Sequence, residues 1–295
     1  MLKRTLVFSN PMNLSLKNQQ IVIAYKDSPD EKVTVPIEDV GVVLLEHQHT
    51  NITLPLLNAL VEGDVQVVIC NAKGMPSAMF QGMNSNNLQG ETLRNQIACG
   101  EVLKKQLRKQ IVEAKIKNQA ALLDSIGEDG CVLRPFYSNV RSGDTDNREG
   151  IAARIYFQHL FGDNFVRDRE EPGVNALLNY GYTILRAATC RAIVTSGLLP
   201  AIGIFHHNRS NAYPLADDLM EPFRPFVDSV VYDLAMNGKM ELTKDVKGEL
   251  ISVLYVDTLF KNVKRPLSVG LSMTTASMAK CLAKEQSILN LPTML

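Results

Sequence analysis

The chain has 295 residues, of which 45% are apolar, so it can bury a core as one large or two modest domains and is not expected to be disordered. Its 31 basic and 31 acidic side chains cancel, so any binding of nucleic acid must come from local basic patches. The five cysteines form no CxxC pair, which argues against a zinc ribbon or disulfide framework and fits a reducing cytosol. Because the sequence has neither a run of about 18 apolar residues nor a signal-peptide core, we expect a cytoplasmic protein that does not enter membranes.

The first 76 residues predict a β-rich domain. Apolar and polar residues alternate around Leu14 and again over 33–37, which is the period of a half-buried strand. The nearly continuous apolar runs at 40–45 and 65–69 are typical of strands buried on both faces. A short helix is expected between these two runs, because Leu54, Leu57 and Val61 share one helical side.

From Glu91 onward, apolar residues recur at spacings of three and four, which indicates helices. Asp144, Thr145 and Asp146 are N-cap candidates for one of them. The predicted fold is α+β: a small N-terminal β-rich domain (1–76), a linker or exposed hairpin (77–90) and a larger all-α domain (91–295). The predicted helices span about 103–123, 148–161, 175–196, 215–227, 244–260 and 267–287.

Acidic residues and histidines gather in the segment GIFHHNRSNAYPLADDLMEPFRPFVD. Asp217, Asp218 and Glu221 share one face of a helix, where three carboxylates repel one another unless a cation or an arginine neutralises them. An acidic first turn that complements the helix dipole is the structural alternative. The adjacent His206 and His207 favour a divalent metal, since carboxylate oxygens and imidazole together suit such ions.

Basic residues suggest two places where phosphates could bind. Lys104, Arg108 and Lys115 fall along one side of the helix at 103–119 and could follow a DNA backbone, although such charges usually form a solvated face. Between residues 118 and 238 there are ten arginines and no lysine. Arginine matches phosphate oxygens in pairs, but several of these side chains could instead pair with the region's own acids.

The stretch NALLNYGYTILRAATCRAIVTSGLLPAIGIFHHNRSNAYPLADDLMEPFRPFVD, residues 175–228, resembles the signature region of the Cas-one family of CRISPR-associated proteins. It is most similar to the form that accompanies type II systems, through its NYGY, GIFH and LADDLMEPFRP elements. AKIKNQ at 114–119 and NREGIAARIYF at 147–157 resemble two further blocks in the same order, so the resemblance covers essentially the whole chain. A tryptophan that the family often has before AKIKNQ is missing, which affects the packing of the core and leaves the assignment of site residues unchanged.

The resemblance implies that Glu149, His206 and Glu221 are the catalytic residues and metal ligands. The family's histidine follows a glycine by three positions, which selects His206 after Gly203 over His207. Two carboxylates and one imidazole suit Mg²⁺ or Mn²⁺ better than a structural zinc.

The resemblance also implies a neighbouring acid one helical turn before Glu221. The spacing favours Asp218 for this role and leaves Asp217 open. Arg224 follows Glu221 by three residues, within reach of Asp217, Asp218 or a substrate phosphate, and its guanidinium could hold the carboxylates in ligand geometry. The alternative is that Arg224 only covers the surface near Pro225.

The implied activity is that of a metal-dependent DNA endonuclease and integrase that inserts spacer DNA into a CRISPR array, in antiviral defence. The implied partners are double-stranded DNA (protospacer and repeat or leader), a second copy in a homodimer formed through the N-terminal domain, and a Cas-two dimer. Type II relatives also work with Cas-nine and a ring-forming protein that binds DNA ends. The alternatives are a stand-alone metal nuclease acting on branched or repair DNA, and a non-catalytic DNA scaffold. The complete set of three ligands argues against the scaffold.

Overall fold

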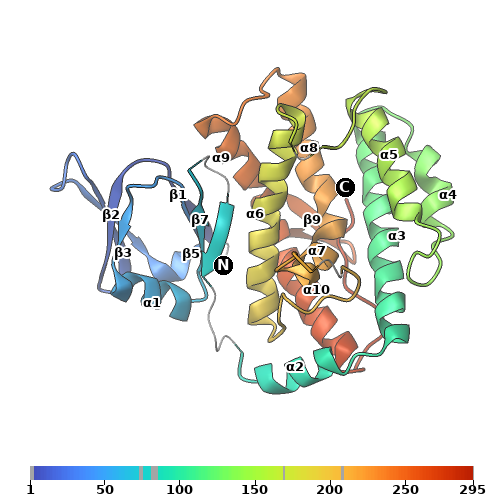
Figure 1. Ribbon diagram of the computed structural model, residues 1–295, viewed down its shortest axis with the longest axis horizontal. Helices are drawn as coiled ribbons and strands as arrows, with labels where there is room; N and C mark the ends of the chain where they lie inside the picture. The colour runs from blue at the N-terminus through green and yellow to red at the C-terminus, as the bar shows by residue number, and fades with distance from the viewer. Residues whose placement is uncertain (1–2, 73–75, 81–85, 169, 207–208, 295) are drawn as a thin grey trace. The chain divides into compact units, whose positions relative to one another are not determined.

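The computed structural model describes residues 3–72, 76–80, 86–168, 170–206 and 209–294. It divides into two compact units, Met1–Asn87 and Leu88–Leu295 (Figure 1). None of the helices in the described ranges is both long and apolar enough to cross a membrane.

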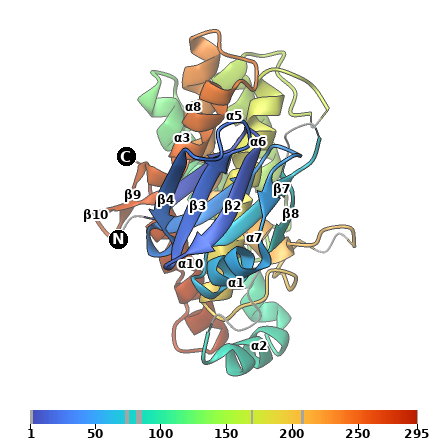
Figure 2. The same ribbon diagram turned by 90° about the vertical axis from the view of Figure 1, so that its left-hand side faces the viewer.

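The first unit is built from two sheets, as the sequence predicts. One sheet has the strand order β1-β5-β7-β8, with β1, β5 and β7 parallel and β8 antiparallel to β7. The other has the order β4-β3-β2-β6, and Figure 2 shows β4, β3 and β2 side by side. The strands are β1 (Arg4–Phe8), β2 (Met12–Lys17), β3 (Gln20–Tyr25), β4 (Lys32–Pro36), β5 (Val40–Leu45), β6 (Asn51–Ile52), β7 (Gln66–Cys70) and β8 (Pro76–Phe80).

Local sequence explains these elements. All six residues of β5 are buried, as expected for a strand without polar alternation. The turn between β2 and β3 places Asn18 and Gln19 at φ values of 50° and 58°, the positive pair that a tight hairpin turn requires. Helix α1 (Leu54–Glu62) buries Leu56 and Leu60 in a core shared by both sheets. The predicted strands and helix of this unit are therefore confirmed.

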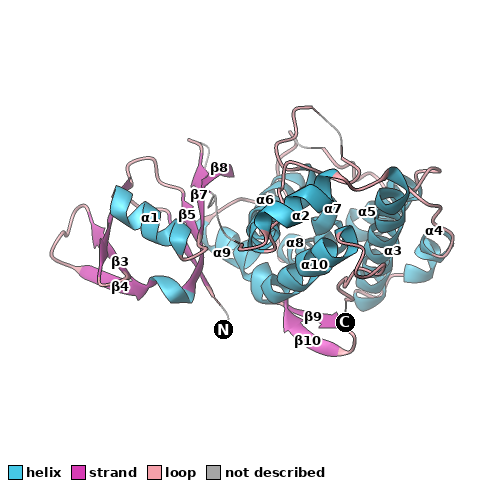
Figure 3. Cartoon of the chain, turned by 90° about the horizontal axis from the view of Figure 1, so that it is seen from below, coloured by secondary structure: helices cyan, strands magenta, loops and turns pink. Residues whose placement is uncertain are grey.

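The second unit is mainly helical. Helix α6 packs against α7, α8, α9 and α10, while α3 packs against α5 and α8. Figure 3 shows these helices with the β9–β10 hairpin beside them. The helices are α2 (Gln89–Ile97), α3 (Glu101–Ser125), α4 (Arg134–Tyr137), α5 (Arg148–Phe161), α6 (Val174–Thr195), α7 (Pro214–Met220), α8 (Arg224–Met236), α9 (Lys244–Ser252) and α10 (Leu267–Leu282). Short 3-10 turns occur at Ile37–Asp39, Gly130–Leu133, Glu221–Phe223 and Val253–Tyr255.

The predicted α+β fold, a β-rich domain followed by a larger helical one, is confirmed, but two details of the second half of the chain are wrong. The larger domain is not all-α, because the chain leaves the helix predicted over 244–260 and forms β9 (Asp257–Phe260) and β10 (Val263–Pro266). The alternating burial of β9 is a strand pattern, and the positive φ values of Lys261 and Asn262 close the hairpin.

The segment predicted as a linker or hairpin, 77–90, contains most of β8 and the first residues of α2, and its residues 81–85 lie outside the described ranges. β8 hydrogen-bonds along β7, so this part of the segment belongs to the first sheet.

Candidate active site

Two acidic side chains from separate elements converge on one lysine that is largely buried. Glu149 lies in the first turn of α5, and Glu221 begins the 3-10 turn that joins α7 to α8. Lys115 Nζ of α3 lies 2.7 Å from Glu149 Oε1 and 2.5 Å from Glu221 Oε2. The ammonium group therefore bridges two carboxylates that are far apart in the sequence.

Local capping explains how Glu149 is placed. Asp144 accepts hydrogen bonds from the backbone N–H groups of Arg148 (2.8 Å) and Glu149 (3.1 Å). These N–H groups have no partner within the helix, so the Asp144 carboxylate fixes the first turn of α5. Asn147 occupies the N-cap position itself, with a left-handed φ of 51°. Of the three predicted capping residues, Asp144 does the capping.

Two arginines complete the cluster. The Arg108 guanidinium of α3 pairs with Glu149, and Arg224 Nε lies 3.0 Å from Glu221 Oε1. The cluster of Arg108, Lys115, Glu149, Glu221 and Arg224, which we call the ion cluster, thus has three cations and two carboxylates. Its net charge of about +1 suits a phosphate-bearing substrate.

The charges of the ion cluster stabilise one another. Burial alone would raise the pKa of Glu221, but the positive charges of Arg224 and Lys115 hold it well below its ordinary value. Burial lowers the pKa of Lys115, and the charges of Glu149 and Glu221 more than reverse this, so the net pKa is raised. Both groups therefore stay ionised at neutral pH.

His206 is held by an acid on α7. Asp218 accepts hydrogen bonds from the backbone N–H groups of Ile204 (2.7 Å) and Phe205 (3.1 Å), and its Oδ1 lies 2.7 Å from His206 Nδ1. This hydrogen bond raises the pKa of His206, and burial opposes the shift. With Nδ1 facing Asp218, Nε2 is the nitrogen left for another ligand. A side chain at Gly203 would meet Asp218 Oδ2 at 3.0 Å, so the loop needs glycine there.

The two aspartates of α7 have different surroundings. Asp217 is 2.7 Å from Arg186 Nε and 2.7 Å from Asn211 Nδ2, whereas Asp218 contacts His206. The geometry therefore makes Asp218 the acid next to the predicted ligand. His207, the other histidine of the pair, lies outside the described residues.

Phe205 connects the His206 loop to the ion cluster. The guanidinium carbon of Arg108 lies 3.9 Å from the centre of the Phe205 ring, and the Phe205 ring meets the His206 ring edge-on at 5.8 Å. Because Arg108 also pairs with Glu149, these contacts connect Glu149 to His206 through Arg108 and Phe205. The structure thus brings together the three predicted ligands Glu149, His206 and Glu221, without direct contact between His206 and either glutamate.

Two of the three members of the predicted basic ridge on α3 are little exposed to solvent. Arg108 is only 3% exposed and Lys115 only 11%, because their side of α3 packs against α5 and the Glu221 turn. Both pair with Glu149, and Lys115 also pairs with Glu221, so their charges are directed at acids rather than at solvent. Lys104 is partly exposed and pairs with Glu101 at 3.0 Å. The apolar residues around Arg108, namely Leu107, Ile111 and Val112, are the sequence signal that this side is buried.

Arg224 contacts neither of the two aspartates that the sequence placed within its reach. Besides pairing with Glu221, its guanidinium carbon lies 4.5 Å from the centre of the Tyr182 ring. Its side chain is 23% exposed, and its Nε pairs with Glu221, so it does more than cover the surface near Pro225.

The donor set has the chemistry of a divalent-metal site. Across the described ranges, no three acids, histidines or cysteines are close enough to hold a metal ion as they stand. Glu149 and Glu221 nevertheless converge on one cation, and carboxylate oxygens with one imidazole are suitable ligands for Mg²⁺ or Mn²⁺. The two carboxylates therefore fit such an ion, provided that Lys115 and His206 shift.

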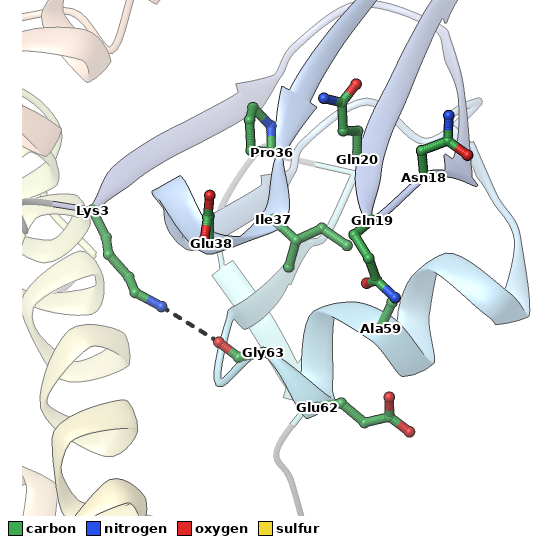
Figure 4. Close-up of a pocket in the computed structure, with 10 residues that line it drawn as sticks. All are labelled: Lys3, Asn18, Gln19, Gln20, Pro36, Ile37, Glu38, Ala59, Glu62 and Gly63. Atoms are coloured by element: carbon green, nitrogen blue, oxygen red, sulfur yellow. Dashed lines mark hydrogen bonds between the residues drawn. The ribbon is translucent and has the colours of Figure 1, made fainter.

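Two cavities of the described structure are lined by none of the predicted site residues. One of about 560 Å³ lies in the first unit, where Lys3 Nζ donates a hydrogen bond of 3.4 Å to the Gly63 carbonyl (Figure 4). Another of about 700 Å³ lies in the second unit, between Phe260, Met273 and the segment 286–293. The predicted ligands Glu149, His206 and Glu221 therefore lie in the ion cluster and the His206 loop, away from these two cavities.

Comparison with known sequences identifies relatives. The family described as CRISPR associated protein Cas1 matches residues 5–263. A CRISPR-associated endonuclease Cas1 of Neisseria meningitidis is 42% identical over 256 residues, which cover 85% of this chain and 83% of that protein. A second such endonuclease, from Francisella tularensis subsp. novicida, is 26% identical over 268 residues, 83% of each chain.

Solved structures share the fold. A casposase bound to its integration product superposes with a TM-score of 0.78 at 22% identity, covering 98% of this chain and 93% of that one. A CAS1 protein from Thermotoga maritima superposes with a TM-score of 0.75 at 17% identity, covering 96% and 98%. A Cas6-RT-Cas1–Cas2 complex gives a TM-score of 0.74 at 21% identity, covering 98% of this chain and 36% of the other.

Proposed function

Because this chain belongs to the Cas1 family of CRISPR-associated endonucleases, we propose that it inserts spacer DNA into a CRISPR array in a reaction that requires Mg²⁺ or Mn²⁺. The observation that carries the proposal is the convergence of Glu149 and Glu221 on Lys115, beside the pair of His206 and Asp218. These are the positions that the family motifs single out.

Glu149, Glu221 and His206 Nε2 would hold the metal ion. When bound, such an ion orients the scissile phosphate and offsets charge on the leaving oxygen. Asp218 fixes the ring orientation and tautomer of His206 through Nδ1, so that Nε2 would be available to the metal ion. Arg108, Lys115 and Arg224 add positive charge that attracts the phosphate and stabilises its more negative transition state.

The nucleophile decides the outcome of the reaction. Attack by a DNA 3′-hydroxyl forms a new phosphorus–oxygen bond and breaks the bond to the old 3′ oxygen. The attacking hydroxyl gives its proton to solvent, and the departing 3′ oxygen takes one up and leaves as a hydroxyl. One phosphodiester replaces another, so no nucleotide cofactor is needed. Attack by water at the same phosphate gives cleavage instead, which is the endonuclease activity.

The partners follow from the family and its neighbours. The casposase of similar fold is bound to an integration product, and another neighbour is a Cas1–Cas2 complex, which supports double-stranded DNA and a Cas2 dimer as partners of this chain. We further propose a homodimer, with Cas9 and a ring-forming DNA-end protein as additional partners in a type II system. The protospacer and the array's repeat or leader are the proposed DNA substrates.

An integration assay separates this proposal from its rivals. A labelled protospacer duplex with 3′-hydroxyl ends is incubated with a supercoiled array plasmid, with and without Mn²⁺ and with and without Cas2. We expect label joined covalently to the plasmid only with metal, and more of it with Cas2. Cleavage without any joined product would favour a stand-alone nuclease, and DNA binding without either product would favour a scaffold.

A further inference from the structure

A buried acid outside the ion cluster joins three helices. Asp228 of α8 is 1% exposed and accepts hydrogen bonds from the hydroxyls of Tyr156 of α5, at 2.9 Å, and Tyr182 of α6. Burial and the charge of Asp228 raise the pKa of both tyrosines well above its ordinary value. Both hydroxyls are therefore neutral donors, and the carboxylate has a donor on each oxygen.

This network lies on the helices that carry the candidate ligands. Tyr156 follows Glu149 by seven residues, two turns along the same face of α5. Asp228 follows Arg224 by four residues on α8, one turn from the arginine that pairs with Glu221. The bond between Tyr156 and Asp228 thus links the helix of one carboxylate to the helix that continues from the other.

Tyr182 makes the second link. Its hydroxyl is bonded to Asp228, and its ring lies under the Arg224 guanidinium, 4.5 Å from ring centre to guanidinium carbon. The ring therefore supports the arginine that holds Glu221 Oε1 at 3.0 Å. Through Tyr182, the orientation of Asp228 is coupled to that of Arg224.

We propose that Tyr156, Tyr182 and Asp228 form a positioning clamp, which sets the spacing of Glu149 and Glu221 and holds Arg224 in its pairing with Glu221. The clamp rests on the proposed function, because its purpose is to keep two carboxylates in the geometry that a divalent ion needs. None of its three residues touches the reacting groups, so they are positioning residues.

The composition of the clamp favours positioning over simple packing. Burying a carboxylate is costly, and here burial raises the pKa of Asp228 to about 6 despite the two hydroxyls and Arg224, which act to lower it. Apolar side chains could hold α5, α6 and α8 together without that cost. Directed hydrogen bonds fix the rotation and register of helices, which apolar contacts leave looser.

Conservative variants of the full chain test the clamp. Tyr156→Phe removes one hydroxyl, Asp228→Asn removes the charge, and Tyr182→Phe removes the second hydroxyl while keeping the ring under Arg224. The matched control is Thr274→Val, which removes a buried hydroxyl that donates to the Asn290 carbonyl at 2.7 Å, on α10, which carries none of the site residues. For each variant, stability is measured by urea unfolding and the dissociation constant for Mn²⁺ by calorimetry, well below the unfolding transition.

The expected result separates positioning from stability. Tyr156→Phe and Asp228→Asn should weaken Mn²⁺ binding about tenfold, which is the usual effect of losing a residue that orients a ligand. Thr274→Val should lose a comparable amount of stability but leave Mn²⁺ binding unchanged. Tyr182→Leu, which removes the ring, should weaken Mn²⁺ binding more than Tyr182→Phe does. If Asp228→Asn does not fold, Tyr156→Phe decides the matter.

Two results would overturn the clamp. The first result is that Tyr156→Phe and Asp228→Asn bind Mn²⁺ as tightly as Thr274→Val does, while Glu221→Gln abolishes Mn²⁺ binding. This result would refute the clamp but leave the metal site standing. Failure of the unmodified protein to bind Mn²⁺ would refute the metal site and the clamp together.

Discussion

Arg224 shows how one residue can serve two contacts that depend on its shape. Its Nε pairs with Glu221 Oε1 at 3.0 Å, while its flat guanidinium covers the ring of Tyr182. A lysine has a single point of charge and cannot do both. The negative charge of Glu221 outweighs burial and raises the pKa of Arg224, so this side chain is always charged.

Arg224→Lys should therefore reduce strand transfer although it keeps the charge. We expect a loss of about tenfold, partly recovered at high Mn²⁺, because Glu221 would be held less firmly in ligand geometry. The measurement is strand transfer across a manganese titration, with Arg154→Lys on the exposed part of α5 as the matched control. A titration curve that superimposes on that of the unmodified protein would show that only the charge matters.

Asp228 should leave a signature in the pH dependence of stability. Burial raises its pKa from the ordinary 3.8 to about 6, so the folded chain binds this proton more tightly than the unfolded chain does. The contribution of this group to stability is therefore fully present below about pH 4 and is lost as the pH rises through 6. The Asp228→Asn variant has no ionisable group at this position, so its stability lacks this pH dependence.

Urea unfolding of both proteins between pH 4.5 and 7.5 tests that signature. The free energy of unfolding of the unmodified protein, relative to Asp228→Asn, should fall by about 2 kcal/mol over this range. A difference that stays constant with pH would mean that Asp228 ionises as easily in the fold as in the unfolded chain.

At the scale of the element, the apolar period predicts long helices well. The predicted ends of α3, α5 and α6 agree with the structure to within two residues. Helices α3 and α5 bury one face each, whereas α6 is buried on most sides. The β9–β10 hairpin was not predicted. Its strands are four residues each, too short for a period of two to stand out beside helical neighbours.

Helix α3 shows why charge patterns mislead when read along a single element. Arg108 and Lys115 have the sequence appearance of a solvated face, yet Arg108 is buried against Glu149 and Lys115 is largely covered between Glu149 and Glu221. Those partners lie on α5 and in the 3-10 turn before α8, so the ion pairs depend on tertiary packing that helical spacing alone does not reveal. The family blocks placed Glu149, His206 and Glu221 in one site, and only the structure shows that Lys115 bridges the two glutamates.

At the scale of the whole molecule, the candidate chemistry lies in one of the two units. The predicted boundary around 77–90 contains the observed division between residues 87 and 88. Glu149, His206 and Glu221 all belong to the unit Leu88–Leu295, on α5, the loop before α7 and the turn after it. The sequence could not decide between Asp217 and Asp218, because both lie on the helix face next to Glu221, and the hydrogen bond to His206 distinguishes them.

The central claim is that Glu149, His206 and Glu221 support metal-dependent strand transfer. The most direct measurement compares covalent joining of a protospacer to array DNA, in Mn²⁺ and in EDTA, for Glu149→Gln, His206→Ala and Glu221→Gln. Glu249→Gln, which removes the charge of an exposed surface pair with Lys239, is the control. We predict that each of the three variants keeps the circular dichroism spectrum of the unmodified protein but loses strand transfer on the order of a hundredfold or more. The control should retain full activity. Unmodified protein that joins DNA equally well in EDTA, or a Glu221→Gln variant as active as the control, would contradict the account.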